Sequence, residues 1–149
     1  MFAPKNILVP TDFSKYANAA LKKAVDIATQ HDTEIYLLHV INEQIQQRAY
    51  DYFFSYEVVK QLEKAGVKAS RDKLKEEDEG IIKEKKIKVI FDVKNGVPSE
   101  VILSEQKAKK IDLIVIASHG KTGFLKKPMG SVADKVVKGS KCPVIVVEP

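Results

Sequence analysis

Short apolar runs alternate with longer amphipathic stretches along this chain. Five continuous runs are rich in Ile, Leu and Val: residues 6–10, 34–40, 87–93, 112–117 and 143–147. Such runs are typical of parallel strands that are covered on both faces. Three stretches place apolar side chains at helical spacing instead: residues 14–28, 99–109 and 131–138. This alternation predicts an α/β fold, with an open parallel five-stranded sheet and helices on both faces.

The segment between the second and third runs, residues 42–84, has a weaker pattern. A cluster of aromatic residues at positions 50–56 precedes a charged stretch, residues 60–80, that has helical character. The first half of the segment fits either a loop or a short helix. No internal repeat, linker or second domain is evident, so we expect the 149 residues to form one domain, 1–149.

Composition agrees with a soluble globular protein, at 44% hydrophobic and 30% charged residues. No apolar run approaches the roughly 18 residues that a membrane span needs, and the N-terminus leads into a strand instead of a signal peptide. We therefore expect a cytoplasmic protein without a membrane partner. The single cysteine, Cys142, excludes an intramolecular disulfide and a multi-cysteine metal site.

The net charge of +5 raises the question of nucleic-acid binding. Residues 60–88 contain ten basic and seven acidic residues, so their charge largely cancels. Residues 119–141 differ, because they hold six lysines and only one acid, Asp134. This cationic, glycine-bearing segment indicates a local anion site, and we expect no nucleic-acid partner.

Ligands of open parallel sheets bind at the carboxyl ends of the strands, where the winding direction reverses. Asp12 follows the first strand, and a glycine-bearing loop follows the fourth and leads to Gly130 and Ser131 at a helix start. Glycines allow close approach of a phosphate, and a helix start offers unpaired N–H donors. Each feature alone also fits a plain turn or helix cap. Together they favour an anion site.

Two common phosphate motifs are absent. Gly120-Lys121-Thr122 imitates the end of a P-loop, but Val115 stands where that motif requires glycine. No Gly-x-Gly-x-x-Gly occurs either.

The loop nevertheless resembles the nucleotide loop of the universal stress protein family, in its ATP-binding branch. That pattern is Gly-x-x-Gly, nine residues, then Gly-Ser or Gly-Thr, and the spacing from Gly120 to Gly130-Ser131 matches it. Four further segments follow the family order: residues 7–14, 38–40, 96–98 and 112–115. The resemblance implies a Rossmann-like, adenine nucleotide alpha hydrolase-like sheet with strand order 3-2-1-4-5.

The resemblance also implies ligand contacts. Residues at the ends of the first two strands would border the adenine and ribose: Pro10, Thr11, Asp12 and Val40. The loop and the following helix start would hold the phosphates: Ala117, Ser118, His119, Gly120, Lys121, Thr122, Gly123, Gly130, Ser131, Val132 and Ala133. ATP is the expected cofactor, and Mg²⁺ or Mn²⁺ would arrive with it because the sequence offers no metal site of its own.

One position departs from the family pattern, because Ala117 replaces its first glycine. The methyl group disfavours a positive φ and could crowd the phosphates. Asp12 could accept hydrogen bonds from ribose hydroxyls or an exocyclic amine, or it could cap a turn. His119 could face a phosphate or line the loop. Cys142 fits a buried structural thiol better than a reactive one.

These features favour an ATP-binding regulatory protein of the stress response over a catalyst. No carboxylate pair or positioned base accompanies the phosphate loop, so we expect no catalytic residues and at most slow hydrolysis. One alternative is a nucleotide-independent, dimeric interaction protein of the same fold. Another is an adenylyl-transfer enzyme, for which 149 residues leave little room.

The last strand predicts the assembly. In the order implied by the resemblance, Val144–Val147 lies at a sheet edge, where unpaired main-chain groups invite another chain. Lys141 and Pro143 guard only its beginning. We expect a homodimer through this strand, as the resemblance also implies; a monomer whose edge is covered by its own loop is the alternative.

Overall fold

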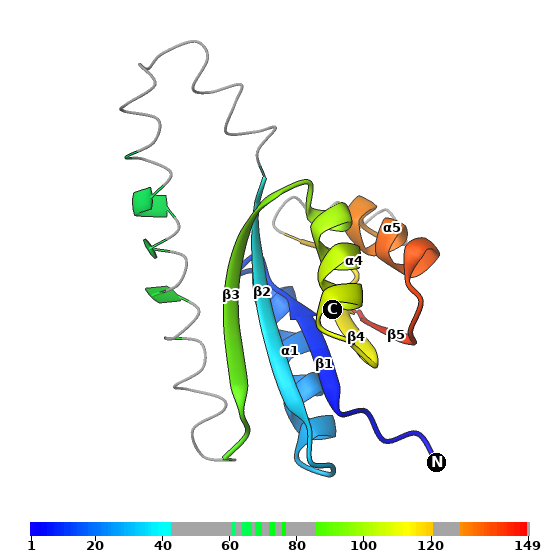
Figure 1. Cartoon of the computed structure of the whole chain (residues 1–149). Coiled ribbons are helices and arrows are strands. Elements are labelled where there is room, and N and C mark those ends of the chain that lie inside the picture. Colours follow the sequence, from blue (N-terminus) through cyan, green and yellow to red (C-terminus); the bar gives the residue numbers. More distant parts are fainter. Residues whose placement is uncertain are drawn as a thin grey trace.

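The computed structural model describes residues 1–42, 61, 64–66, 68–69, 72–73, 76, 86–120 and 129–148 (Figure 1). Its elements are β1 (Asn6–Pro10), α1 (Lys15–Ala28), β2 (Glu34–Asn42), β3 (Val89–Gly96), α4 (Pro98–Ala108), β4 (Leu113–Ala117), α5 (Ser131–Gly139) and β5 (Val144–Val147). The five predicted strands and the helices predicted at residues 14–28, 99–109 and 131–138 are confirmed, with small shifts at their ends. β3 shifts most, since it begins two residues later and ends three residues later than predicted. The stretch 60–80 lies mostly outside the described residues.

The five strands form one parallel sheet in the order β3-β2-β1-β4-β5, as the resemblance implied. β1 lies at its centre, and Ile7, Leu8 and Val9 are at most 1% exposed. The continuous aliphatic character of this strand therefore has a direct cause, because side chains on both faces of the sheet are covered.

Alternate strand residues enter two separate cores. Ile7 and Val9 of β1 pack with the alanine-rich face of α1, whereas Leu8 packs with residues of α4 and α5. Figure 1 shows α1 on one face of the sheet, with α4 and α5 on the other. Within the described part of the chain, no helix combines the length and the apolar character that crossing a bilayer requires.

The turn between β3 and α4 explains one of the family-like segments. Gly96 has φ +147°, and a β-carbon there would lie 2.7 Å from Cγ2 of Val101. Glycine is therefore required on both conformational and steric grounds. Pro98 occupies the first turn of α4, where its missing N–H costs no helical hydrogen bond.

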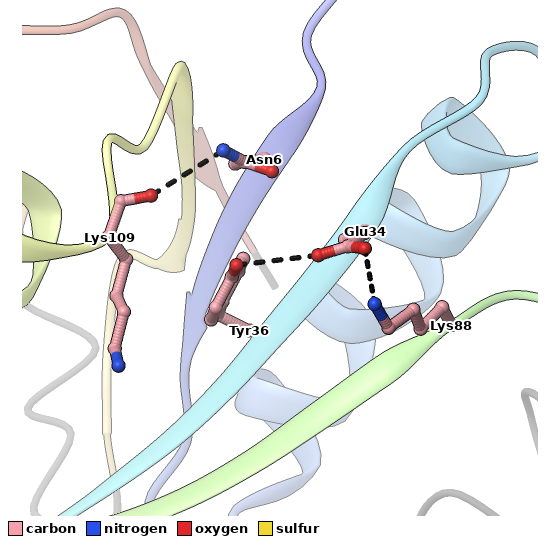
Figure 2. Close-up of polar contacts among 5 residues, drawn as sticks. All are labelled: Asn6, Glu34, Tyr36, Lys88 and Lys109. Atoms are coloured by element: carbon pink, nitrogen blue, oxygen red, sulfur yellow. Dashed lines mark hydrogen bonds and ion pairs between the residues drawn. The ribbon is translucent and has the colours of Figure 1, made fainter.

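The amino ends of the strands are tied by polar contacts (Figure 2). Asn6 Nδ2 donates to the carbonyls of Lys109 and Lys110, at 3.4 and 3.2 Å. Asp112 accepts the main-chain N–H groups of Lys5 and Asn6, at 2.9 and 3.0 Å. These bonds hold the α4–β4 turn, in which Lys110 has φ +50°, against the start of β1.

A second group in Figure 2 joins β2 to the segment before β3. Lys88 Nζ donates to Glu34, and Tyr36 Oη donates to the same carboxylate at 3.4 Å. The bond from Lys88 lowers the pKa of Glu34, whereas burial raises the pKa of the Tyr36 hydroxyl. The polar groups at this end of the sheet satisfy one another, which favours a structural role.

Glu105 is a nearly buried carboxylate between α4 and β3. Its side chain is 10% exposed and accepts an ion pair from Lys94 Nζ at 3.0 Å. The bond to Glu105 is the main cause that raises the pKa of Lys94 above its ordinary value of 10.5. This pair links α4 to the edge strand β3.

We expect Lys94→Met to lower the free energy of unfolding at pH 7 by about 1 kcal/mol, because the Glu105 carboxylate loses its cation while Lys94 itself is half-exposed. Folding raises the Lys94 pKa, so the contribution is complete below pH 10.5 and is lost as pH rises through the raised value. Urea unfolding of both proteins between about pH 7 and 11.5 measures the difference. A difference that does not narrow at alkaline pH would contradict this assignment. Lys88→Met, at an exposed pair, is the control and should change stability less.

Candidate functional site

The carboxyl end of β1 continues into a tight turn, Thr11–Ser14. Thr11 Oγ1 accepts the N–H of Phe13 at 3.1 Å, and Asp12 Oδ1 accepts the N–H of Ser14 at 3.0 Å. Ser14 then caps α1 by accepting the N–H of Ala17 at 3.2 Å, as predicted. These side-chain bonds replace main-chain pairing where the chain leaves the sheet.

Phe13 is the strained residue of this turn, with φ +65°. A left-handed conformation costs a bulky residue on the order of 1–3 kcal/mol and persists where the surroundings enforce it. Its ring lies 4.5 Å from the His39 ring, centroid to centroid, and the Lys73 ammonium lies 4.7 Å from the Phe13 centroid. Side chains from β2 and from residue 73 thus hold Phe13 in place.

The carboxyl end of β2 is joined to the same turn. Thr11 is buried, and its N–H donates to the Leu38 carbonyl at 2.8 Å. His39 Nδ1 lies 2.8 Å from the Thr11 carbonyl oxygen. Because a carbonyl can only accept, the Nδ1 atom carries the proton and donates it. Val40, the residue predicted to border the base, follows directly.

The carboxyl end of β4 is a junction of main-chain bonds at Ser118, which is fully buried. Its N–H donates to the Val147 carbonyl at 3.0 Å, and its carbonyl accepts the N–H of Gly130 at 2.6 Å. The Ser118 hydroxyl lies 2.9 Å from Nδ1 of His119. His119 is buried, and its ring centroid lies 6.5 Å from that of Tyr16. His119 is therefore packed into this junction of β4 and α1.

Asp12 and Gly120 bring the ends of β1 and β4 together. A β-carbon on Gly120 would lie 2.5 Å from Asp12 Oδ2, so the carboxylate occupies the space that a side chain at position 120 would need. Gly120 does not have a positive φ. The constraint on a side chain at position 120 is therefore steric and comes from the Asp12 carboxylate, which would have to shift.

The start of α5 faces the same junction. Gly130 is the N-cap, with φ −68° and ψ 159°, and no side chain caps the helix among the described residues. The first-turn N–H groups, at Ser131, Val132 and Ala133, precede the first helical bond, from Asp134 N to the Gly130 carbonyl. This end of a nine-residue helix carries partial positive charge and open donors, the arrangement that binds anions.

A β-carbon on Gly130 would lie 3.0 Å from the Ser118 carbonyl oxygen. Sequence reasoning explained this glycine by close approach of a phosphate. The described contacts show that close packing against the loop also requires it. Ser131, in contrast, is exposed and can present its hydroxyl to a ligand.

Ala117 ends β4 in an extended conformation, paired with Val147 and without a positive φ. The methyl group therefore causes no backbone strain. Three predicted residues, Lys121, Thr122 and Gly123, lie outside the described residues, as does the aromatic cluster at positions 50–56. Among described residues, no group of three His, Cys, Asp or Glu side chains could hold a metal ion.

Sequence reasoning missed three residues around this site: Phe13, His39 and Lys73. A histidine in an apolar strand and a phenylalanine before a helix carry no signal of a special conformation. Lys73 is one of many lysines in a charged stretch. Their arrangement depends on tertiary contacts, which local pattern does not encode.

Comparison with known proteins agrees with the fold. The profile of the universal stress protein family matches residues 4–148. Universal stress protein MJ0577 of Methanocaldococcus jannaschii is 37% identical over 161 residues, covering 97% of this chain and 94% of that protein. MJ0531 from the same organism is 34% identical over 146 residues, covering 97% of this chain and 82% of its own length.

Solved structures give the same result. The MJ0577 structure superposes with a TM-score of 0.84 at 32% identity, covering 97% of this chain and 96% of that chain. The structure of UspA from Lactobacillus plantarum superposes with a TM-score of 0.81 at 26% identity, covering 99% of both chains. With a family profile spanning nearly all its residues and relatives of this likeness, the chain belongs to the universal stress protein family.

Proposed function

We propose that this protein is a regulatory binder of adenine nucleotides, with ATP as its ligand, at the carboxyl ends of β1, β2 and β4. The single observation that carries the proposal is the start of α5, which no side chain of the described residues caps, beside a loop that resembles the ATP-binding family pattern. Main-chain N–H groups at Ser131, Val132 and Ala133 would bind the phosphates, and the Ser131 hydroxyl would add a donor.

The main chain of Val40 would form hydrogen bonds with the base. Leu38 directs its carbonyl toward Thr11, and main-chain groups in a strand alternate in direction, so Val40 directs its N–H and carbonyl to the same side. β1 has ended there and its chain turns toward α1. One donor and one acceptor at this spacing suit an adenine edge, which carries an acceptor nitrogen next to an exocyclic amine.

Asp12 would bind the ribose hydroxyls, which lie between the base and the phosphates in a nucleotide. Asp12 is partly buried, and its carboxylate lies against Gly120 after the end of β4. A divalent cation would neutralise phosphate charge and would arrive with the nucleotide. We infer that the protein acts through the presence or absence of bound nucleotide more than through nucleotide hydrolysis.

Two solved structures of this fold contain adenine nucleotides. A universal stress protein in complex with cAMP superposes with a TM-score of 0.69 at 18% identity. A family protein from Arabidopsis thaliana with AMP bound superposes with a TM-score of 0.60 at 21% identity. At these identities the likeness concerns the fold, so the proposal depends on the described residues of this chain.

The content of the purified protein tests the proposal. We expect an acid-quenched sample, run on an anion-exchange column, to release ATP or ADP at about one per chain, or calorimetry to detect binding of added ATP. A protein that is empty and ignores added nucleotide would contradict the proposal. That result would favour a nucleotide-independent interaction protein of the same fold.

We expect Gly120→Ala to weaken ATP binding about tenfold, because its methyl group displaces the Asp12 carboxylate. The backbone tolerates alanine there, since Gly120 has no positive φ. Calorimetric titration of the wild type, Gly120→Ala, Asp12→Ala and the double variant measures the coupling.

Asp12→Ala should weaken binding by a similar factor, and the methyl group should then add little in the double variant. Full additivity of the two changes would contradict a shared mechanism. Thermal unfolding of all four proteins is the control for folding.

We also propose a homodimer through β5. Ile114 N donates to Pro143 O and Ser118 N to Val147 O, so alternation directs the main-chain groups of Val144 and Val146 away from β4. An edge strand with outward donors and acceptors can pair with its symmetry mate about a two-fold axis. All four side chains of β5 also pack on the two cores, so side-chain changes there would disturb the fold.

Val146→Pro tests this edge, because it removes an outward N–H without removing a bond to β4. We expect light scattering to give twice the 16.7 kDa chain mass for the wild type and a shift toward the single-chain mass for Val146→Pro. Val146→Ala keeps the N–H and is the matched control, with dimerisation retained. A monomeric wild type, or a dimer that survives proline, would contradict pairing through β5.

A further inference from the structure

His39 contacts the Thr11–Ser14 turn at two points. Its Nδ1 donates to the Thr11 carbonyl at 2.8 Å, and its ring packs on Phe13 at a centroid distance of 4.5 Å and an interplanar angle of 44°. One contact fixes the peptide that joins Thr11 to Asp12. The other supports the strained residue on the far side of Asp12.

The bond to Thr11 also ends the β1–β2 ladder. The N–H of Thr11 donates to the Leu38 carbonyl. In a regular parallel ladder, the carbonyl of Thr11 would then accept the N–H of Val40. Among the described residues, that carbonyl is bonded by the imidazole of His39 and not by the N–H of Val40. The N–H of Val40 can therefore serve another acceptor on the side of the sheet where β1 has ended.

The direction of Asp12 depends on the same peptide. The Thr11 carbonyl and the Asp12 N–H belong to one rigid plane, so an oxygen held by His39 also fixes the start of Asp12. Asp12 then directs Oδ1 to Ser14 and Oδ2 against Gly120. A turn free to rotate at this peptide would move the carboxylate away from the β4 loop.

We propose that His39 is a positioning residue of the nucleotide site, which orients Asp12 and exposes the Val40 N–H without touching the ligand. This inference rests on the proposed function, because it concerns the base and ribose half of that site. The phosphate half, at the start of α5, makes no described contact with His39. Loss of the imidazole should therefore weaken nucleotide binding while leaving phosphate binding intact.

A role in packing alone predicts something different. Leu37 and Leu38 are at most 1% exposed and serve the two cores, whereas His39 is only partly buried. Leucine at position 39 would fill similar volume and favour the strand, but it has no donor for Thr11. Asparagine places its amide nitrogen where Nδ1 stands, two bonds beyond the β-carbon, and can restore the bond.

The test compares His39→Leu with His39→Asn in the full chain, using calorimetry with ATP and with inorganic triphosphate. We expect His39→Leu to lose at least tenfold in ATP affinity and less than twofold in triphosphate affinity. His39→Asn should recover most of the ATP affinity. His31→Leu, at the opposite end of the sheet, is the control for a histidine-to-leucine change and should bind as the wild type does.

A spectroscopic measurement tests the contact of His39 with the turn independently of nucleotide binding. Nitrogen-15 spectra of the ligand-free wild type should show His39 with its proton on Nδ1, in slow exchange with water, and His39→Leu should shift the amide resonances of Asp12 and Phe13. Equal ATP affinities in the wild type and a folded His39→Leu would overturn the proposal, as would a proton on Nε2 alone. A wild type that binds no nucleotide would overturn the proposed function, and the spectra would still show whether His39 holds the turn.

Discussion

The main-chain bonds of Ser118 are the constraint on which the carboxyl end of this sheet depends. One buried residue connects β4 to the end of β5 through its N–H and to the start of α5 through its carbonyl. The loop at the end of β4 is thereby bound on two sides. Because Gly130 approaches this carbonyl so closely, the first turn of α5 is held with its N–H groups toward the strand ends. The open helix start is a consequence of how the sheet ends.

The two ends of the sheet therefore serve different purposes. At the amino ends, carboxylate, amide and ammonium groups satisfy one another: Asn6 with the α4–β4 turn, Asp112 with β1, and Glu34 with Lys88 and Tyr36. At the carboxyl ends, a helix start leaves main-chain donors open, and no side chain of the described residues caps them. A parallel sheet places all strand ends of one kind together, so this division follows from topology.

The sequence predicted the fold because burial on both faces leaves a simple signal. Ile7, Leu8 and Val9 must all be apolar in a covered strand, and Gly96 and Pro98 suit their turn for local reasons. The candidate site was predicted only in part. Its glycines and strand ends could be located from spacing, but the contact of His39 with Phe13 joins residues 26 positions apart. No local pattern encodes such a pair.

The glycine pattern of the β4 loop illustrates why spacing alone does not reveal the reason for a glycine at each position. Neither Gly120 nor Gly130 has a positive φ. A β-carbon would press on the Asp12 carboxylate at position 120 and on the Ser118 carbonyl at position 130. Ala117 lies within β4, where extended backbone accepts any side chain. An alanine is therefore tolerated at the first position of the pattern, whereas it would displace protein atoms at the other two. The loop depends on close packing between the ends of β1, β4 and α5, and its tolerance of substitution follows those contacts.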